Sequence, residues 1–236
     1  MRPQINLLEY FKYKINKKSY TLKKEAQRFS WLSKYQFNSI LDVGSNEGQF
    51  AEKILSIFPS AEIYCFEPLP EVFEKLKLNF KDRSNFHYYN YALGDFSVEM
   101  DIHRNEYSPS SSLLEMLDLH KSNFDFAVKS EVTRIQTRTL DSIFSTPILN
   151  PVLLKIDVQG YEMQVLKGAE LVLQQANVII IETSFYELYK NQPLFEDIYS
   201  YLISKDFRYV GNIEQLESPK DHQVLQADAV FIKKQL

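Results

Sequence analysis

The sequence predicts an α/β domain with a mostly parallel sheet. A short β-rich run at 39–43 leads into a glycine-containing turn, and apolar residues recur at helical spacing from Gln49 onward. A second unit of strand, turn and helix begins at Pro151. Two late strands, 209–211 and 227–232, are separated by a polar loop without a helix, so they must be antiparallel neighbours. We therefore expect a parallel sheet that ends in an antiparallel hairpin.

The first half of the sheet is expected to hold three strands. The helix after the glycine turn should extend to about Phe58, and the second strand is the apolar run 63–67, which Pro68 ends. A helix over 72–80 then leads to a third strand at 86–93. The end of this third strand should lie beside the end of the second.

An inserted segment is expected around 96–138. Residues alternate between apolar and polar at 98–104 and again at 132–139, which is typical of a hairpin or of short extra strands. The polar run Ser108–Ser112 lies between them. A serine cluster of this kind is usually a solvated loop, and the alternative is that it folds over a bound cofactor.

The second half begins with a strand that carries two charges. Lys155 and Asp157 interrupt the apolar run from Pro151 at period two, so both side chains point to the same side. Burying both charges without a role would be costly, so they either pair with each other or face a ligand crevice at the strand end, and we favour the crevice. A helix, a strand at 178–182 and a helix over about 194–204 follow.

The glycine turn between the first strand and helix predicts a nucleoside-binding site. Gly44 and Gly48 allow a sharp turn and leave no Cβ toward a ligand, and free N–H groups of the next helix should face the same space. Glu67 ends the neighbouring strand, where a carboxylate can accept both hydroxyls of a ribose. The alternative is that the glycines only shape the turn and Glu67 caps the next helix.

The spacing of this turn argues against a dinucleotide. The chain lacks the Gly-x-Gly-x-x-Gly pattern of such sites and instead places Asp42 just before the turn. A carboxylate there suits the ammonium group of an amino-acid-bearing nucleoside such as S-adenosylmethionine. We therefore expect the ammonium of this cofactor near Asp42, its carboxylate near the helix N-terminus and its ribose on Glu67.

Length and composition indicate one soluble domain with a modest appendage. The chain has 236 residues and a single cysteine, Cys65, so no disulfide framework exists and a reducing compartment is expected. No apolar run is long enough to span a membrane, and the polar residues Glu9 and Lys12 interrupt any secretion signal. We expect a cytoplasmic protein.

Residues 1–38 are expected to form a basic arm. They contain nine Lys or Arg residues against two Glu residues, whereas the remainder of the chain is acidic. Apolar residues recur near helical spacing, which predicts two short amphipathic helices that pack on the body or form a lid. Such an arm could contact an anionic substrate, a membrane surface or nucleic acid, or pack on the acidic body of its own subunit or of a second copy in a homo-oligomer. No nucleic-acid partner is expected.

The motifs resemble those of the FkbM family of methyltransferases. The similarity runs from about Ser39 to Ile232, and its most specific part is the Lys-Ile-Asp-Val-Gln-Gly block at 155–160 with its continuation at 165–169. The matching stretches are Asp42–Gly48, Phe66–Pro68, Asn90–Gly94, Thr139–Asp141, Leu154–Glu162, Val165–Ala169 and Ile181–Glu182.

This resemblance implies a three-layer, Rossmann-like methyltransferase fold with a seven-stranded sheet. It also implies transfer of a methyl group from S-adenosyl-L-methionine to a hydroxyl of a sugar, a glycan or a secondary metabolite. The methyltransferase domain would span 39–236. From their place at the end of the third strand, Ala92, Asn90 and Asp95 are candidates to line an adenine slot, although a plain strand-end turn explains Gly94 and Asp95 equally well. The full set of expected cofactor-binding residues is Asp42, Gly44, Ser45, Asn46, Gly48, Glu67, Pro68, Asn90, Ala92, Leu93 and Asp157.

A hydroxyl acceptor must lose its proton, and carboxylates near the strand ends are the groups expected to take it or to orient the acceptor. The candidates are Asp157, Glu162 and Glu182. Lys155 would either fix one of these carboxylates or lower the pKa of the alcohol.

Several alternatives stay open. His103 and His120 in the inserted segment could act as bases, although such histidines are more often surface or packing residues. Asp157 with Glu182 could hold a divalent cation, which two carboxylates alone do not favour. The competing enzyme class is a nicotinamide-dependent oxidoreductase or a nucleotide-sugar modifying enzyme on a similar sheet. The non-catalytic alternative is an adaptor that binds nucleic acid or membrane through the basic arm.

Overall fold

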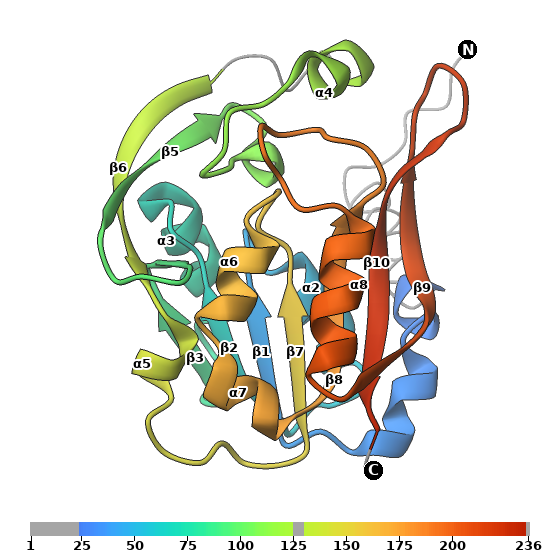
Figure 1. Cartoon of the computed structure of the whole chain (residues 1–236). Helices are drawn as coiled ribbons and strands as arrows, with labels where there is room; N and C mark the ends of the chain where they lie inside the picture. The colour runs from blue at the N-terminus through green and yellow to red at the C-terminus, as the bar shows by residue number, and fades with distance from the viewer. Residues whose placement is uncertain (1–23, 125–129, 235–236) are drawn as a thin grey trace, which may run out of the picture.

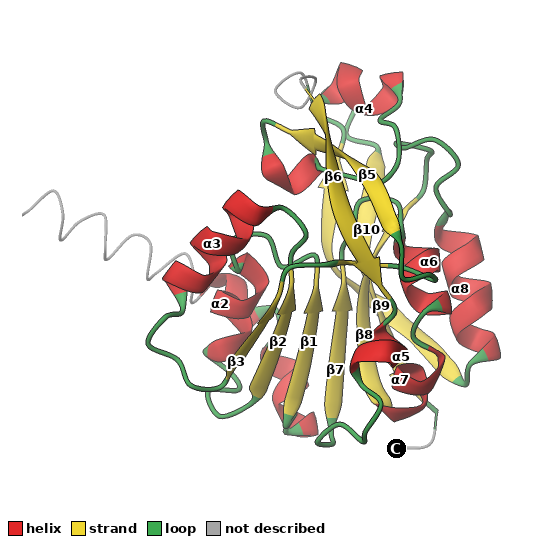
Figure 2. Ribbon diagram, turned by 90° about the vertical axis from the view of Figure 1, so that its left-hand side faces the viewer, coloured by secondary structure: helices red, strands yellow, loops and turns green. Residues whose placement is uncertain are grey.

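The computed structural model describes residues 24–124 and 130–234. Most of the predicted basic arm, 1–23, and a short part of the predicted insertion, 125–129, lie outside the described residues. The described part is built on a seven-stranded sheet with helices on both faces (Figure 1). A smaller three-stranded sheet lies beyond the carboxyl ends of the parallel strands (Figure 2).

The central sheet has the strand order β3-β2-β1-β7-β8-β10-β9. The first five of these strands pair in parallel, and β10 is antiparallel to both β8 and β9. The predicted parallel sheet with a final antiparallel hairpin is therefore confirmed. The strands are β1 (Ser39–Val43), β2 (Glu62–Phe66), β3 (Phe86–Tyr89), β7 (Val152–Ile156), β8 (Ala176–Ser184), β9 (Phe207–Glu217) and β10 (Val224–Lys233).

Two apolar cores lie on opposite faces of this sheet, because successive side chains of a strand point to opposite sides. Leu153 belongs to one core and Leu154 to the other. The Leu153 core includes residues of η1 (Ser30–Tyr35), α2 (Gln49–Leu55) and α3 (Pro70–Asn79), and the Leu154 core includes residues of α6 (Glu162–Lys167), α7 (Glu170–Gln175) and α8 (Phe195–Ser204). Three layers result, as the resemblance implied.

The predicted third strand, 86–93, is interrupted. β3 stops at Tyr89, and the next residues cross to the small sheet, where β4 (Ala92–Leu93) pairs in parallel with β6 (Ser130–Arg138). β6 in turn pairs antiparallel with β5 (Glu99–Asn105), as expected from the alternation in the insertion. The cause of the interruption is Asn90, whose side-chain amide donates to the backbone carbonyls after β2 and so turns the chain.

The helix expected after the fourth parallel strand is two helices, α6 and α7. They are separated at Gly168, where an added Cβ would lie 1.9 Å from the carbonyl oxygen of Gly94. This close approach requires glycine and fixes the small sheet against α6. The remaining short helices are η2 (Ser108–Ser110), α4 (Asp118–Asn123) and α5 (Leu140–Ile143).

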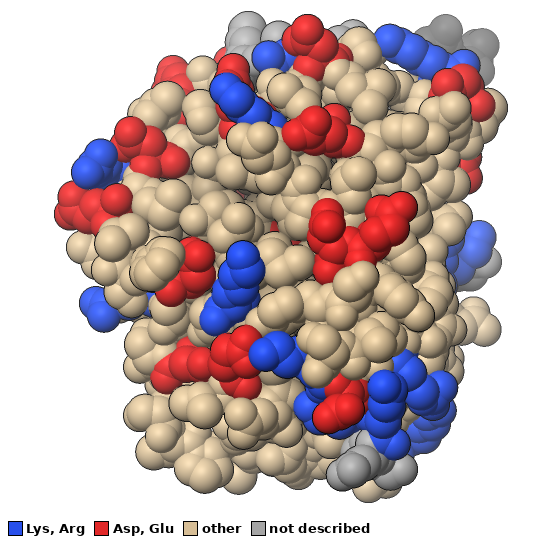
Figure 3. Space-filling model, viewed as in Figure 1, with Lys and Arg blue, Asp and Glu red and all other residues tan. Residues whose placement is uncertain are grey.

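The surface and the helix lengths bear on possible partners. On the face shown in Figure 3, acidic side chains are spread over the surface, and basic side chains gather at the lower right with acidic ones beside them. Among the residues that the structure describes, every helix is too short or too polar to span a bilayer.

Candidate active site

A cavity of about 510 Å³ opens at the carboxyl ends of the parallel strands. It has two ends, which follow the strand order of the sheet. We call one the β1–β2 end; it is lined by Asp42–Asn46, Glu67–Leu69 and Tyr91–Leu93. We call the other the β7–β10 end; it is lined by Lys155, Asp157–Gln159, Glu182 and Gln226–Asp228. Asp42, Glu67 and Asp157, the three carboxylates expected in one crevice, therefore line a single cavity.

The backbone amides of the glycine turn all have acceptors within the protein. The N–H groups of Gly44 and Ser45 both donate to the Phe66 carbonyl at 3.0 Å. The next three amides, from Asn46 to Gly48, donate to Glu67, to the Asn46 side chain and to the Ser45 carbonyl. The amides of the turn itself are therefore not available to an anionic group, because they already have acceptors in the turn and on β2. The expectation that free N–H groups of the next helix face the same space concerns the amides from Gln49 onward and stays a prediction; Gln49 and Phe50 border the cavity.

The two glycines of the turn serve packing between chain segments. Gly44 has φ +82°, and an added Cβ would lie 1.8 Å from the Asp157 carbonyl oxygen. Gly48 has φ +94°, and a Cβ there would lie 2.2 Å from the Phe80 ring. Gly44 borders the cavity, whereas Gly48 does not, so the assignment of Gly48 to cofactor binding is corrected to a packing role. Gly44 joins the two ends of the cavity through its contact with Asp157.

Asp42 lies in the floor of the cavity. Its side chain is 1% exposed, and Oδ2 has no hydrogen-bond partner among the described residues. Burial raises the pKa of Asp42 to about 7, against the lowering effect of the Lys155 ammonium. A buried carboxylate with an unsatisfied oxygen is stabilised in its charged form by a cation bound nearby. Ser45 supports this floor: its Oγ donates to the Asp42 carbonyl at 2.6 Å and accepts from the Phe66 amide at 3.0 Å.

Glu67 is held in a fixed orientation at the end of β2. Its Oε2 accepts from the Asn46 amide at 3.0 Å, and its Oε1 accepts from the Leu69 amide at 2.9 Å. Burial raises the pKa of Glu67 to about 7, although both backbone hydrogen bonds lower it. Each carboxylate oxygen has a second lone pair, so Glu67 can still accept from a ligand.

The remaining wall of the β1–β2 end is mostly apolar. Ala92 and Leu93 border the cavity together with Tyr91, Pro68 and Ile102. Asn90 does not border it, because its side chain turns back to donate to the carbonyls of Glu67 and Pro68 at 2.8 and 3.0 Å. The prediction that Asn90 lines an adenine slot is therefore replaced by a role in shaping the loop that carries Glu67.

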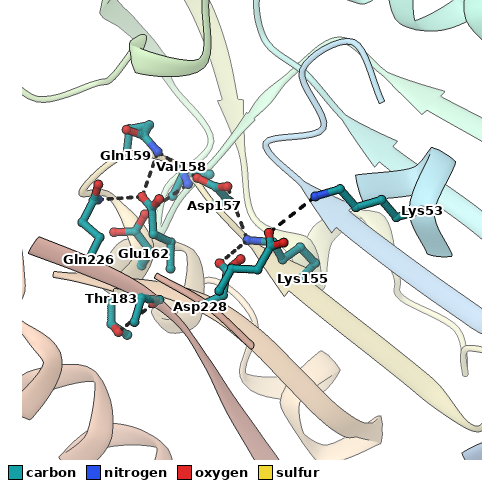
Figure 4. Close-up of polar contacts among 12 residues, drawn as sticks. Lys53, Lys155, Asp157, Val158, Gln159, Glu162, Thr183, Gln226 and Asp228 are labelled. Carbon is teal, nitrogen blue, oxygen red and sulfur yellow. Dashed lines mark hydrogen bonds and ion pairs between the residues drawn. The ribbon is translucent and has the colours of Figure 1, made fainter. Parts of the chain in front are cut away.

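Lys155 forms two ion pairs at the β7–β10 end. Its Nζ lies 2.9 Å from Asp228 Oδ1 and 3.3 Å from Asp157 Oδ2 (Figure 4). Burial lowers the pKa of Lys155, but the carboxylates of Asp157 and Asp228 together outweigh it and raise the pKa above its usual range. Both alternatives considered for the two charges hold at once, since Lys155 and Asp157 are paired and also line the cavity.

Gln159 connects the carboxylates of two neighbouring strands. It has φ +55°, and its Nε2 donates to Asp157 Oδ1 at 2.9 Å and to Glu182 Oε2 at 2.8 Å. Its Oε1 accepts from the Tyr189 hydroxyl at 2.9 Å, and Gln226 donates a further hydrogen bond to Glu182 at 2.9 Å (Figure 4). Burial, and then the charge of Asp157, raise the pKa of Glu182 well above its ordinary value.

Glu162 does not reach the cavity. Its Oε1 accepts from the amides of Val158 and Gly160, both at 3.1 Å, and burial raises its pKa to about 7. The expectation that Glu162 acts as a base or contacts an acceptor is corrected, because this carboxylate fixes the loop between β7 and α6.

The serine cluster of the insertion folds over the cavity. Ser108–Ser112 border it, and the cluster is tied to both ends. The side-chain Nδ2 of Asn46 donates to Ser108 Oγ at 3.0 Å, and Ser112 Oγ donates to the backbone carbonyl of Gln159 at 2.6 Å. The cluster therefore borders the cavity, and the alternative in which it folds over a bound cofactor stays a prediction.

The two histidines of the insertion differ. His120 borders the cavity and is buried between Phe124 and Tyr189, and burial lowers its pKa to about 4, so its ring is neutral near pH 7. Its Nδ1 has no partner among the described residues. His103 lies on β5 and does not border this cavity.

The family model described as the methyltransferase FkbM domain matches residues 42–209. The chain belongs to this family of S-adenosylmethionine-dependent methyltransferases. The matched range contains the glycine turn, Glu67 and the block around Asp157, so the residues of the FkbM domain include most of the cavity wall.

Two curated relatives of this FkbM domain are named for methyl transfer. The 2-O-methyltransferase NoeI of Sinorhizobium fredii is 30% identical over 193 residues, which cover 78% of this chain and 79% of the relative. The hexuronic acid methyltransferase AglP of Haloferax volcanii is 31% identical over 142 residues, which cover 60% of this chain and 54% of the relative. Among solved structures, the N-methyltransferase NodS of Bradyrhizobium japonicum aligns with a TM-score of 0.48 and 11% identity, over 91% of this chain and 96% of that chain.

The β1–β2 end fits the cofactor of an FkbM methyltransferase. Asp42 offers an unsatisfied carboxylate oxygen below the cavity, and Glu67 offers fixed acceptors at the neighbouring strand end. Tyr91–Leu93 supply an apolar wall of the kind that an adenine ring needs. For metals, no group of three or more His, Cys, Asp or Glu side chains within the described ranges is arranged to hold an ion.

Three polar residues of the β7–β10 end were absent from the predicted site: Gln159, Gln226 and Asp228. Gln159 lies inside the specific sequence block, so its position in that block was the available signal. Gln226 and Asp228 lie on β10, which becomes a neighbour of β8 only through long-range antiparallel pairing. The alternating positions 226 and 228 in an otherwise apolar strand were the signal for them, since both side chains point to the same face.

Proposed function

We propose that this protein transfers a methyl group from S-adenosylmethionine to a hydroxyl of a sugar. The observation that carries the proposal is that one cavity has a cofactor-like end, with Asp42 and Glu67, and a carboxylate-rich end, with Asp157 and Glu182. The name of NoeI, a 2-O-methyltransferase, supports an oxygen as the methyl acceptor. The name of AglP, a hexuronic acid methyltransferase, supports a sugar derivative as the substrate. The nicotinamide-dependent alternative has no comparable support from the family match.

The β1–β2 end is proposed to hold the cofactor. Asp42 would stabilise its ammonium group, and Glu67 would accept hydrogen bonds from its ribose hydroxyls. The apolar wall at Ala92 and Leu93 would pack on its adenine. Because Glu67 is fixed by two backbone amides, little side-chain entropy is lost on binding.

The β7–β10 end is proposed to bind and deprotonate the acceptor. With the cofactor bound, the acceptor oxygen bonds to the methyl carbon as the carbon–sulfur bond breaks, the hydroxyl proton passes to a carboxylate, and S-adenosylhomocysteine leaves. We assign the proton to Asp157, which borders the cavity with a side chain that is 36% exposed and is held in place by Lys155 Nζ at 3.3 Å. Glu182, which retains its proton to higher pH than an ordinary glutamate, can donate a hydrogen bond that orients the acceptor.

The proposal is tested by mass spectrometry of sugars incubated with S-adenosylmethionine and the full chain. We expect a methylated product with at least one sugar, and Asp157→Asn should lower the rate about 10² to 10⁴-fold, as expected for the loss of general base catalysis. Asp82→Asn changes an exposed aspartate outside the cavity and is the matched control. A folded protein that binds no S-adenosylmethionine, or an Asp157→Asn variant as active as the control, would contradict the proposal.

A further inference from the structure

The charge of the β7–β10 end restricts which sugars can enter. Asp157, Glu182, Asp228 and Glu214 line this side of the cavity. In the described parts of the chain, Lys155 is the only lysine or arginine that borders the cavity. A ligand at this end therefore meets several carboxylates and one ammonium group.

The Lys155 ammonium is already paired and enclosed. It lies within ion-pair distance of Asp228 and Asp157, and its side chain is 5% exposed. An anionic acceptor could bind this ammonium only by separating it from one of these carboxylates. The freed carboxylate would then face the anion across a partly dehydrated site, where like charges repel strongly.

His120 does not supply a positive charge either. Its ring borders the cavity with an unpaired, buried Nδ1, and it is neutral near pH 7 because burial lowers its pKa to about 4. A neutral imidazole can exchange hydrogen bonds with a hydroxyl, since one ring nitrogen donates and the other accepts. His120 therefore suits an uncharged polar ligand.

Two basic side chains, Arg28 and Lys53, are paired with a carboxylate that borders the cavity. Glu214 on β9 borders the cavity, and its carboxylate binds Arg28 at 3.2 Å and Lys53 at 3.4 Å. In Figure 4, Lys53 extends from its helix toward the side of the cavity where Asp228 lies. Glu214, together with Glu25 at 3.5 Å from Lys53, thus pairs with the two cations that could otherwise attract an anion to this end.

We infer that the part of the acceptor that enters the cavity is an uncharged sugar that carries no carboxylate or phosphate group. Its hydroxyls can donate to the carboxylates of the β7–β10 end, whereas an ionised carboxylate or phosphate group only accepts hydrogen bonds and would be repelled. This inference rests on the proposed function, because it takes the β7–β10 end as the acceptor site. It separates this protein from a uronic acid methyltransferase.

The test uses the full chain, S-adenosylmethionine and a panel of mono- to tetrasaccharides. Each hexose in the panel has a matched uronic acid and a matched uronamide, which has nearly the same shape as the acid without its charge. We expect kcat/KM for the hexoses and uronamides to exceed that for the acids by at least about 100-fold, because like charges at close range are strongly discriminated. Equal or faster methylation of the acids would overturn the inference while supporting the proposed function.

A variant at the mouth gives a second measurement. Glu214→Gln removes the carboxylate that pairs with Arg28 and one of the two that pair with Lys53, so the ratio of kcat/KM for the uronic acids to kcat/KM for the hexoses should rise about 3- to 10-fold. Glu217→Gln, on the same strand but outside the cavity, is the matched control. An equal change for acids and hexoses would overturn the electrostatic argument. Binding of S-adenosylmethionine without methylation of any sugar would instead refute the proposed function itself.

Discussion

The two ends of the cavity are built in different ways. The β1–β2 end uses residues close in sequence, and backbone hydrogen bonds fix them: five successive turn amides have internal acceptors, and Glu67 accepts from two backbone amides. The β7–β10 end collects side chains from three strands distant in sequence, and side chains hold one another through Lys155, Gln159 and Gln226. A substitution at the first end should therefore act locally, whereas one at the second end should disturb several groups together.

The largest effect is expected where the two ends meet. Gly44→Ala would place a Cβ 1.8 Å from the Asp157 carbonyl oxygen at φ +82°, so β1 and β7 would have to separate. We expect a loss of more than about 4 kcal/mol in the free energy of unfolding, or no folded protein. Thermal and urea unfolding measure this. Gly211→Ala is the control, because its Cβ would meet no atom within 4 Å although its φ is also positive. Similar losses of stability in both variants would mean that the positive φ, and not the close contact between Gly44 and Asp157, is responsible.

The next effect tests the side-chain network of the β7–β10 end. Lys155→Met leaves Asp157 and Asp228 without their shared cation, and breaking a buried ion pair from one side costs about 3 to 5 kcal/mol. Lys205→Met removes an exposed pair with Glu170 and should cost less than about 1 kcal/mol. Urea unfolding of both variants compares them. A Lys155→Met protein as stable as wild type would contradict the network.

A smaller effect is expected at the loop that joins β7 to α6. Glu162→Ala removes the acceptor of the Val158 and Gly160 amides and should cost about 1 to 3 kcal/mol, because it leaves buried donors unsatisfied. Glu162→Gln keeps an acceptor oxygen and should recover most of that stability. Both variants should lose methyl transfer only to the extent that the loop moves. Full activity loss in a stable Glu162→Gln protein would instead restore Glu162 as a chemical participant.

The smallest effect is a change in the affinity for S-adenosylmethionine with pH, which tests Asp42 at the β1–β2 end. Burial raises the pKa of Asp42 to about 7, so the free protein binds a proton there near neutrality, and a bound cofactor ammonium favours its release. Affinity for S-adenosylmethionine should therefore rise about tenfold from pH 5.5 to pH 7.0. Calorimetry should show a weaker pH dependence for Asp42→Asn, in which Glu67 is left as the carboxyl group of the β1–β2 end with a pKa raised to about 7. An unchanged pH dependence in Asp42→Asn would contradict the role of Asp42.

The raised pKa values of three buried carboxyl groups also make the stability of the protein depend on pH. Asp42, Glu67 and Glu162 each have a pKa raised to about 7 by burial, so the folded protein binds more protons than the unfolded chain between about pH 4.5 and pH 7. The contribution of these groups to stability is present at the acidic side of this window and is lost as the pH rises through it.

The sequence predicted the β1–β2 end better than the β7–β10 end for a physical reason. The strand, turn and following strand are contiguous, so spacing alone brings Asp42 and Glu67 together. The role of the turn amides could not be predicted, because their acceptors depend on how closely the turn approaches β2. Asp228 could not be paired with Lys155 from spacing, because the antiparallel register of β10 is set by packing over the whole sheet. The interruption of the predicted third strand at Asn90 could not be predicted either, because it involves hydrogen bonds from the Asn90 side chain to the backbone carbonyls of Glu67 and Pro68.

The most direct measurement is the dissociation constant for S-adenosylmethionine in Glu67→Ala and Glu62→Ala, determined by calorimetry on samples shown to be folded. These glutamates lie at opposite ends of β2, and only Glu67 borders the cavity. We predict that Glu67→Ala weakens binding at least about tenfold, or roughly 1.4 kcal/mol, while Glu62→Ala stays within about twofold of wild type. No binding by the folded wild-type protein, or equal affinities in the two variants, would contradict the assignment of the β1–β2 end to the cofactor.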